Sequence, residues 1–459
     1  MAMSRKLSRA PPSFRSRAAR FAAGKALRQR VGRASHSKWT PPKERPDPVE
    51  LLSQADRSRV ARLLPIRYGR MASSLFGFVR GSAALMAHDL ATTPVTGLHV
   101  QLCGDAHLAN FGAFATPERD QVFDVNDFDE TLPGPWEWDP KRLAVSLVVA
   151  ARDRGFSGSV QRRAARTAVR AYREAMAVYG RMPYLDAWYS HIDLASLSHE
   201  VPKLGRKDVG REIARARRRT QFHAFPELTK PVRGRYRIRE NPPLIVHYPD
   251  PADEAVSTRF FSQYLASLPR ERRLLLERYH VEDVAQKVVG VGSVGTVCAI
   301  LLLLADDDVL DPIFLQVKEA DRSVLEPYVG PSIYSNHAER VVVGQRLMQQ
   351  ASDVLLGWGT LGSSDYYVRQ LRDMRYVADT STLGPKGLVG HGAACGAALA
   401  RAHARIGDPA QISGYLGDGT AFDRAVAEFA ERYADQVERD HADLLRAVKK
   451  GRLPAEVGV

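Results

Sequence analysis

The residues best suited to chemistry in this sequence lie in the short segment 103–110, which reads CGDAHLAN and follows a predicted strand. Asp105 and Asn110 are five positions apart, the spacing that places a general base and a magnesium-binding amide at opposite ends of one catalytic loop. The Asp105 carboxylate would accept the proton of an acceptor hydroxyl, and the Asn110 side-chain oxygen would bind a metal ion. His107 lies between them and belongs to the same candidate site.

A second acidic segment, 124–130, reads DVNDFDE and follows another predicted strand. Carboxylates are hard oxygen ligands that suit Mg²⁺, which prefers one or two of them together with substrate phosphates. We expect Asp127 to be the main metal ligand and Asp129 the second. Two other interpretations stay open: each aspartate could be a turn or cap residue, or His107 could join the acidic residues in the metal site of a hydrolase.

A glycine-rich segment, 290–297, reads GVGSVGTV. The pattern G-x-G-x-x-G marks dinucleotide-binding turns as well as kinase loops, and it also occurs by chance. A dinucleotide-binding turn opens a helix, whereas here an apolar run typical of a strand begins at Val297. Glycines between two antiparallel strands let the backbone fold over phosphates. The residues predicted to bind nucleotide in this loop are Gly290, Gly292, Ser293, Gly295 and Val297.

A lysine follows at the end of the next predicted strand, in the segment 313–318 (IFLQVK). Burying Lys318 among apolar strand residues would be costly without an anionic partner, and a nucleotide phosphate would supply one. Glu339, in the helix predicted from about residue 336, could pair with Lys318 and orient it toward the phosphates. Glu319 or Glu326 could do so instead, and Lys318 could also be an edge-strand lysine facing water.

The surrounding pattern predicts a mixed α+β fold. A strand, loop and hairpin unit is expected over 98–129, long helices over 139–179, and strands over 285–318. A helix near 336–350, short strands near 354–356 and 366–371, and helices near 390–405 and 422–449 complete the chain. We expect a basic, disordered arm and linker over 1–49, a large lobe with a helical insertion over 50–280, a small nucleotide-binding lobe over 281–372, and helices completing the large lobe over 373–459.

The net charge of +14 is concentrated at the start of the chain. Of the 66 Lys and Arg residues, 12 lie within 1–43, where there is no Asp or Glu, and the rest nearly balance the 52 acidic residues. This arm could be a solvated tail, a transit peptide, or a contact for nucleic acid or an anionic surface. The basic run Arg215–Arg219 could be a solvated helix face or a phosphate-binding one. No apolar run is long enough for a transmembrane segment, and three scattered cysteines predict a reducing cytoplasm.

The candidate catalytic residues resemble those of aminoglycoside phosphotransferases and related small-molecule kinases. The likeness lies in Gly104-Asp105-x-His107-x-x-Asn110, in Asp127-Phe128-Asp129, and in the later segment 138–144 (WDPKRLA). The resemblance implies a two-lobed protein-kinase-like fold that uses ATP and Mg²⁺, in which Asp139 would be structural. Because the catalytic loop precedes Lys318 by more than two hundred residues here, the resemblance also implies a circular permutation.

Over roughly residues 25–445 the chain also resembles an uncharacterised bacterial family, domain of unknown function 2252. The segments 65–71 (PIRYGRM), 100–107 (VQLCGDAH) and 344–349 (GQRLMQ) carry that likeness. One departure from the phosphotransferase pattern is Cys103, which stands where those enzymes have a mainly architectural histidine.

The sequence thus predicts an ATP- and Mg²⁺-dependent phosphotransferase acting on the hydroxyl of an unknown acceptor. Nucleotidyl transfer on the same fold is a variant. A non-catalytic pseudokinase, or a nucleic-acid-binding protein using the basic arm, is the alternative from a different functional class.

Overall fold

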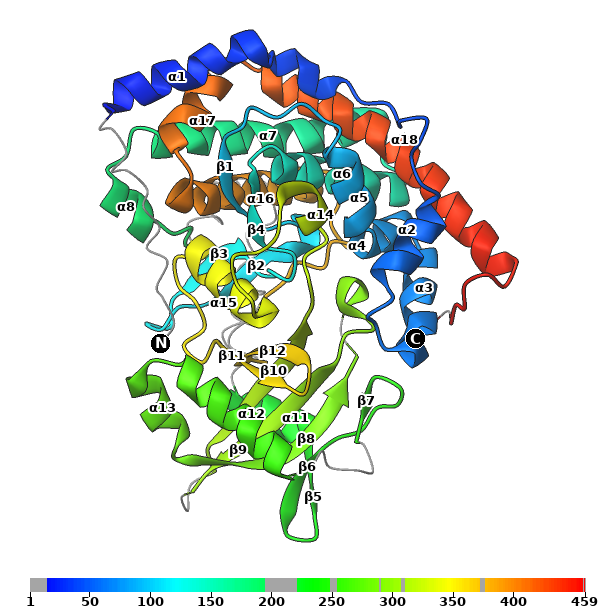
Figure 1. The fold of residues 1–459 in the computed structure, drawn as a ribbon, viewed down its shortest axis with the longest axis vertical. Helices are drawn as coiled ribbons and strands as arrows, with labels where there is room; N and C mark the ends of the chain where they lie inside the picture. Colours follow the sequence, from blue (N-terminus) through cyan, green and yellow to red (C-terminus); the bar gives the residue numbers. More distant parts are fainter. Residues whose placement is uncertain are drawn as a thin grey trace.

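The computed structural model describes residues 15–194, 221–247, 254–288, 290–306, 310–371 and 376–456, together with residue 458. It has a mixed α+β architecture, as predicted, and about half of the described residues are helical. Helices fill the upper part of Figure 1, and an antiparallel sheet lies in the lower part. None of the described helices has an apolar stretch long enough to cross a membrane.

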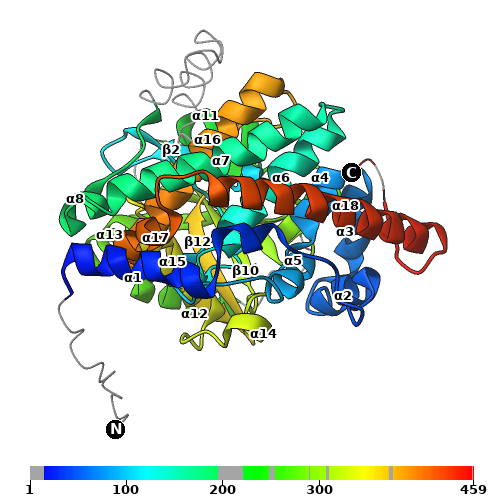
Figure 2. The ribbon, with the colours of Figure 1, turned by 90° about the horizontal axis from the view of Figure 1, so that it is seen from above.

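The helical part is built around α6 (Trp138–Asp153), which is buried along almost its whole length. Long apolar faces on the neighbouring helices explain this burial, since each covers a different side of α6. Figure 2 shows α18 crossing over α6 and α7. These neighbours are α7 (Gly158–Tyr179), α16 (Pro385–Ile406) and α18 (Ala421–Lys449), while α17 (Pro409–Leu416) packs on α7.

Two small strand pairs lie in the segment 99–135. In the first, β1 (His99–Leu102) pairs with β4 (Leu132–Pro135), and in the second, a hairpin, β2 (Phe111–Ala115) pairs with β3 (Gln121–Val125). Both pairs are antiparallel, which confirms the strand, loop and hairpin unit predicted over 98–129. The predicted catalytic loop lies between β1 and β2, and the acidic segment follows β3.

The sheet has six described strands in the order β11-β12-β10-β9-β8-β7, each antiparallel to its neighbours. Alternation along β10 turns Gln316 and Lys318 to one face, while Leu315 and Val317 pack with α12 on the other. The strands are β7 (Ile245–Val246), β8 (Tyr279–Lys287), β9 (Cys298–Ala305), β10 (Pro312–Ala320), β11 (Gly357–Leu361) and β12 (Ser364–Gln370).

The sheet part begins earlier in the chain than the predicted boundary at residue 281. Phe260 and Tyr264 of α12 pack on one face of the sheet, and Phe225 of α11 packs on the other. The apolar faces of the strands need cover on both sides, and these segments supply it. They are α11 (Gln221–Leu228), β5 (Thr229–Val232), β6 (Arg235–Ile238), α12 (Glu254–Ser267) and α13 (Arg270–Leu276).

The described part of the predicted basic arm is folded. Its arginines cap another helix: Arg28 donates to Tyr415 O at 2.8 Å and Gly414 O at 2.6 Å, and Arg33 donates to Leu416 O at 2.6 Å. These carbonyls end α17 and need donors, which explains why positive charge accumulates in this segment. The segment forms α1 (Arg17–Arg30), beside α17 in Figure 2, and the short helix η1 (Arg33–Ser37).

A further group of short helices runs from the arm to β1. It comprises α2 (Pro48–Ala55), η2 (Ala61–Leu63), α3 (Leu64–Ala72), α4 (Leu75–Gly81) and α5 (Ala83–Leu90). The remaining elements are η3 (Leu108–Asn110), α8 (Tyr184–Tyr189), η4 (Val291–Ser293), α14 (Glu326–Val329) and α15 (His337–Met348). The first fourteen residues and the basic run Arg215–Arg219 lie outside the described residues.

Candidate active site

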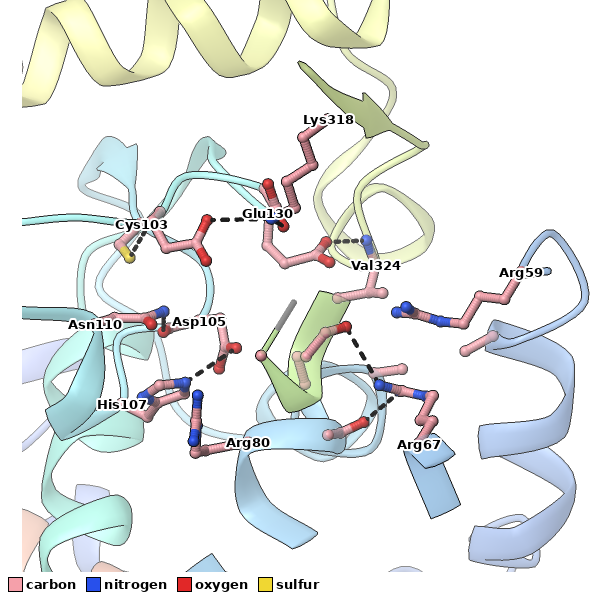
Figure 3. Close-up of a pocket in the computed structure, with 18 of the residues that line it drawn as sticks. Arg59, Arg67, Arg80, Cys103, Asp105, His107, Asn110, Glu130, Lys318 and Val324 are labelled. Atoms are coloured by element: carbon pink, nitrogen blue, oxygen red, sulfur yellow. Dashed lines mark hydrogen bonds and ion pairs between the residues drawn. The ribbon is translucent and has the colours of Figure 1, made fainter. Parts of the chain in front are cut away.

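A polar cavity of about 150 Å³ lies between the helical part and the sheet. The cavity is lined by Asp105 and Asp127 of the helical part and by Lys318 of the sheet, although Lys318 is far from the two aspartates in the sequence. Figure 3 shows Asp105, His107 and Asn110 on one side and Lys318 near the top. The charged and polar lining residues are Arg59, Arg67, Arg80, Asp105, His107, Asn110, Asp127, Asp129, Glu130, Gln316, Lys318 and Arg369.

The predicted catalytic loop is held by α6. Asp139 accepts hydrogen bonds from the backbone N–H groups of Cys103 at 2.7 Å and Gly104 at 3.0 Å, and His403 contacts the same carboxylate at 3.1 Å. Gly104 has φ of +85°, and a Cβ there would lie 2.5 Å from Glu130 O, so glycine is required. The structure therefore gives Asp139 the architectural role that the resemblance implied.

Asp105 is presented to the cavity with one oxygen already occupied. Arg142 donates to Asp105 Oδ1 from Nε at 2.9 Å and from Nη2 at 2.7 Å. The other oxygen, Oδ2, lies 3.8 Å from His107 Nε2, too far for a hydrogen bond. The Asp105 side chain is 16% exposed, so an oxygen in reach of a ligand remains.

His107 is a neutral neighbour of Asp105. Burial lowers the pKa of His107 to about 3, although the Asp105 charge acts in the opposite direction. Its Nδ1 accepts the Ala109 N–H at 3.2 Å, so the ring proton lies on Nε2. His107 can therefore orient the loop, but it is not available as a proton acceptor on the Asp105 side.

The three residues predicted to bind metal lie around the same cavity. Asn110 donates through Nδ2 to Asp105 O at 2.6 Å, which leaves its amide oxygen for another ligand. Asp127 and Asp129 line the same cavity, and their carboxylates, like this amide oxygen, are hard donors of the kind that Mg²⁺ prefers. Within the described ranges, no group of three or more His, Cys, Asp or Glu side chains is arranged to hold a metal by itself, so a metal here would need the amide or ligand phosphates as well.

Lys318 pairs with the acidic segment rather than with the following helix. Its ammonium forms an ion pair with Asp129 Oδ2 and lies 3.9 Å from Asp127 Oδ1. Burial by itself would lower the pKa of Lys318, but the two carboxylates raise it above its ordinary value. Tyr367 also donates to Asp129 Oδ1, at 2.8 Å. The lysine is therefore charged and held beside the candidate metal ligands.

The predicted pair between Lys318 and Glu339 does not form among the described contacts. Near the start of α15, the buried Arg340 contacts the acidic segment instead. Its guanidinium donates a hydrogen bond to Asp129 O at 2.8 Å. The two other candidates are also engaged elsewhere: Glu319 accepts the Val297 N–H at 2.9 Å, and Glu326 pairs with Arg322 at 2.9 Å. Among the described contacts, Asp129 and, at 3.9 Å, Asp127 are the carboxylates that pair with the ammonium, in place of Glu339.

The glycine-rich segment connects β8 and β9, two antiparallel strands, as predicted. Gly290 and Gly292 line the cavity, Ser293 ends η4, and Val297 immediately precedes β9. The loop is held by residues of the N-terminal helices. Arg67 donates to Val291 O at 2.7 Å, Arg59 donates to Val294 O at 2.7 Å, and the Val60 N–H donates to Gly295 O at 2.7 Å.

The N-terminal arginines of the cavity were not among the predicted site residues. Arg59, Arg67 and Arg80 lie in a stretch for which periodicity indicated only helices, and arginine is common on helix surfaces. One signal was available, since Arg67 falls in the segment 65–71 that carried the family resemblance. Glu130 and Arg369 also line the cavity and were missed. Burial raises the pKa of Glu130 to about 7.

A comparison with protein families agrees with the resemblance seen in the sequence. The model of the family described as "Uncharacterized protein conserved in bacteria (DUF2252)" matches residues 59–447, a range that contains all the charged and polar residues of the cavity. The searches of curated proteins and of solved structures found no similar protein. Since the match covers most of the chain, the protein belongs to the DUF2252 family of uncharacterised proteins conserved in bacteria.

Proposed function

We propose that this protein is an ATP- and Mg²⁺-dependent phosphotransferase that acts on a hydroxyl group, on a circularly permuted, two-lobed protein-kinase-like fold. The observation that carries the proposal is the shared cavity, because a candidate base, candidate metal ligands, a charged lysine and a glycine-rich loop all line it. Such a combination matches the parts that phosphoryl transfer requires: positioning of the reactants and neutralisation of charge.

The proposed chemistry assigns one role to each side of the cavity. Asp105 accepts the proton of the acceptor hydroxyl as its oxygen attacks the γ-phosphorus, the bond to the β-phosphate oxygen breaks, and ADP leaves. Lys318 and the glycine-rich loop bind the phosphates, while Asn110, Asp127 and Asp129 would hold Mg²⁺. When bound, the ion supplies positive charge that offsets the charge on the phosphate oxygens. Arg142 keeps Asp105 oriented.

The order of parts in the sheet supports the kinase-like interpretation. In protein kinases a glycine-rich loop joins two strands, the next strand carries the phosphate-binding lysine, and a helix follows. Here β8, the loop, β9, β10 with Lys318 and α15 follow in that order. The catalytic loop comes before them in the sequence, and a circular permutation accounts for the reversal because the groups still lie close in space.

Nucleotide binding is the first test of the proposal. We expect ATP with Mg²⁺ to raise the melting temperature of the protein, since a ligand that binds only the folded state stabilises it. The Asp105→Asn variant should retain this shift, while transfer of label from γ-labelled ATP to water or an acceptor falls by about 10²- to 10⁴-fold. Unchanged transfer in Asp105→Asn would remove this residue from its role.

The position of the label separates two reactions. Label from the γ position supports phosphoryl transfer, whereas label that is transferred only from the α position would indicate nucleotidyl transfer.

The described cysteines, Cys103, Cys298 and Cys395, are free and buried. Free thiols are typical of reducing compartments, which supports the proposal that the reaction takes place in the cytoplasm.

A further inference from the structure

Arg80, at the end of α4, is a cavity arginine with no hydrogen bond or ion pair among the described contacts. It is half-buried, its Nε is shielded from solvent, and that nitrogen has no partner among the described residues. An arginine head group with unmet donors in a partly closed cavity is costly, unless an anion binds there. Its guanidinium presents several donors in a fork that matches phosphate oxygens.

The other cations of the cavity are already engaged. Lys318 is paired with Asp129, as described above. Arg59 forms an ion pair with Asp56 at 2.8 Å and donates to Val294 O. Arg369 donates to Gln316 Oε1 at 2.9 Å. Arg80 therefore differs from them in that its head group remains available to a ligand.

Both halves of the site fix the backbone that carries Arg80. Arg67, which holds the glycine-rich loop, also donates to Gly81 O at 2.8 Å. Arg142, which holds Asp105, also donates to Val79 O at 2.5 Å. The residues on either side of Arg80 are thus tied to the phosphate-binding loop and to the candidate base. This arrangement holds Arg80 in place before any ligand binds.

The head group of Arg80 lies between these two halves. A Cβ added to Gly290 would lie 3.1 Å from Arg80 Nη2, so the guanidinium touches the glycine-rich loop. Asp105 and Asp127 are the acidic residues whose charges act on it most strongly. Figure 3 shows Arg80 beside His107 and below Asp105. A phosphoryl group passing from the loop to an acceptor at Asp105 would have to pass Arg80.

We propose that Arg80 is a catalytic residue that binds the oxygens of the phosphoryl group during its transfer; this rests on the phosphotransferase function proposed above. As the acceptor oxygen bonds to the γ-phosphorus and the bond to ADP breaks, Arg80 offsets negative charge on the transferring group. It gives up no proton, since the acceptor proton passes to Asp105. The α4 segment, for which the sequence indicated only a helix, thereby becomes part of the active site.

The test compares Arg80→Gln and Arg80→Lys with Arg57→Gln, which changes an exposed arginine just after α2, in the same N-terminal group of helices. The readouts are ATP hydrolysis with water as the acceptor, the affinity for Mg·ADP, and the affinity for Mg·ADP with tetrafluoroaluminate, which mimics the group in transfer. We expect Arg80→Gln to lower kcat by about 10³-fold, the lower end of the range for arginines that contact a transferring phosphoryl group. Arg80→Lys should recover only part of this loss.

The analogue separates catalysis from binding. Arg80→Gln should weaken binding of the ADP–fluoroaluminate complex by more than about 100-fold and change the ADP affinity by less than about threefold, since only the analogue resembles the transition state. Equal losses for the two ligands, or a kcat close to that of the wild type, would overturn the proposal. Because Arg80 makes no hydrogen bond among the described contacts, we expect melting temperatures close to that of the wild type.

The same experiment distinguishes failure of this inference from failure of the proposed function. If the wild-type protein binds neither Mg·ATP nor Mg·ADP, the phosphotransferase proposal fails, and the role of Arg80 fails with it. If the wild type binds and hydrolyses ATP while the Arg80 variants match it, only the role of Arg80 is wrong.

Discussion

The two loops that face each other across the cavity are held in different ways. The catalytic loop is held by the core of its own part: Asp139 accepts two of its N–H groups, and Ser146 accepts the Leu108 N–H at 2.9 Å. The glycine-rich loop receives its bonds from outside the sheet, through Arg59, Val60 and Arg67. The candidate base is thus fixed by α6, and the proposed phosphate-binding loop is fixed by the N-terminal helices.

Because the two loops are held differently, substitutions on the two sides should affect different properties. A change at Asp139 should disturb the position of the base and so reduce turnover. A change at Arg67 should release the glycine-rich loop and so weaken nucleotide binding. Arg142 and Arg67 both donate hydrogen bonds to backbone carbonyls of α4, so this short helix is connected to both loops.

The largest expected effect is that of Arg67→Met. The variant removes bonds to Val291 O and Gly81 O and the buried ion pair with Asp56 at 3.0 Å. Breaking a buried pair by removing one partner typically costs about 3–5 kcal/mol, and Asp56 retains Arg59, so we expect about 3 kcal/mol less unfolding free energy. Urea denaturation measures this loss, with Arg57→Met as the exposed control.

Affinity for nucleotide gives the second readout of the Arg67 variant. We expect weaker binding of Mg·ATP because the glycine-rich loop loses its anchor. Stability and ATP affinity that both match those of Arg57→Met would show that the sheet holds this loop without the N-terminal helices.

A smaller loss is expected for Asp139→Asn, which keeps the shape of the side chain but removes its charge. Hydrogen bonds to charged groups contribute about 1.5–3 kcal/mol each, and the amide can still accept one of them, so we expect the unfolding free energy to fall by about 2 kcal/mol. The rate of ATP hydrolysis should fall more than the ATP affinity, because the change lies on the base side. A loss of ATP affinity with an unchanged rate of ATP hydrolysis would show that Asp139 supports nucleotide binding and not the position of the candidate base.

The smallest effect concerns Glu130, which joins the two sides by accepting the Val324 N–H at 2.8 Å. Its pKa rises from 4.5 to about 7 through burial, so the folded state binds this proton more tightly than the unfolded state does. The resulting stability is fully present below pH 4.5 and is lost as the pH rises through 7. As the pH rises from about 5 to about 6.5, the unfolding free energy of the wild type should therefore fall by about 1–2 kcal/mol more than that of Glu130→Gln.

Denaturant titrations at the two pH values measure this difference. The substitution leaves the neighbouring ion pair between Asp129 and Lys318 unchanged, so that pair is a common background to both proteins. Parallel pH profiles for the wild type and Glu130→Gln would show that Glu130 ionises normally in the folded protein.

Much of the site could be predicted because its residues are chemically unusual where they stand. Three features are unusual for residues with a purely structural role: Asp105 with Asn110, the glycines before a strand, and a lysine inside an apolar strand. All of these segments line the cavity. Local pattern also located α15 and α18 to within a few residues. These features depend on short stretches of sequence.

The missed features depend on contacts between distant segments. Arg59, Arg67 and Arg80 resemble ordinary helix-surface arginines until the sheet is placed against them. The same holds for α1, whose charge suggested an arm because its partners, the carbonyls that end α17, lie almost four hundred residues away. The pair between Lys318 and Glu339 failed for a related reason: spacing along the chain identifies a carboxylate but not the nearest one.

The contact between α1 and α17 imposes an order on folding during synthesis. Gly24 and Gly414 lie where the two helices meet, and a Cβ on either would come within about 2 Å of a backbone oxygen of the other helix. Helix α1 leaves the ribosome almost four hundred residues before the surface that it covers. It must therefore remain without this native partner while the residues between them are made.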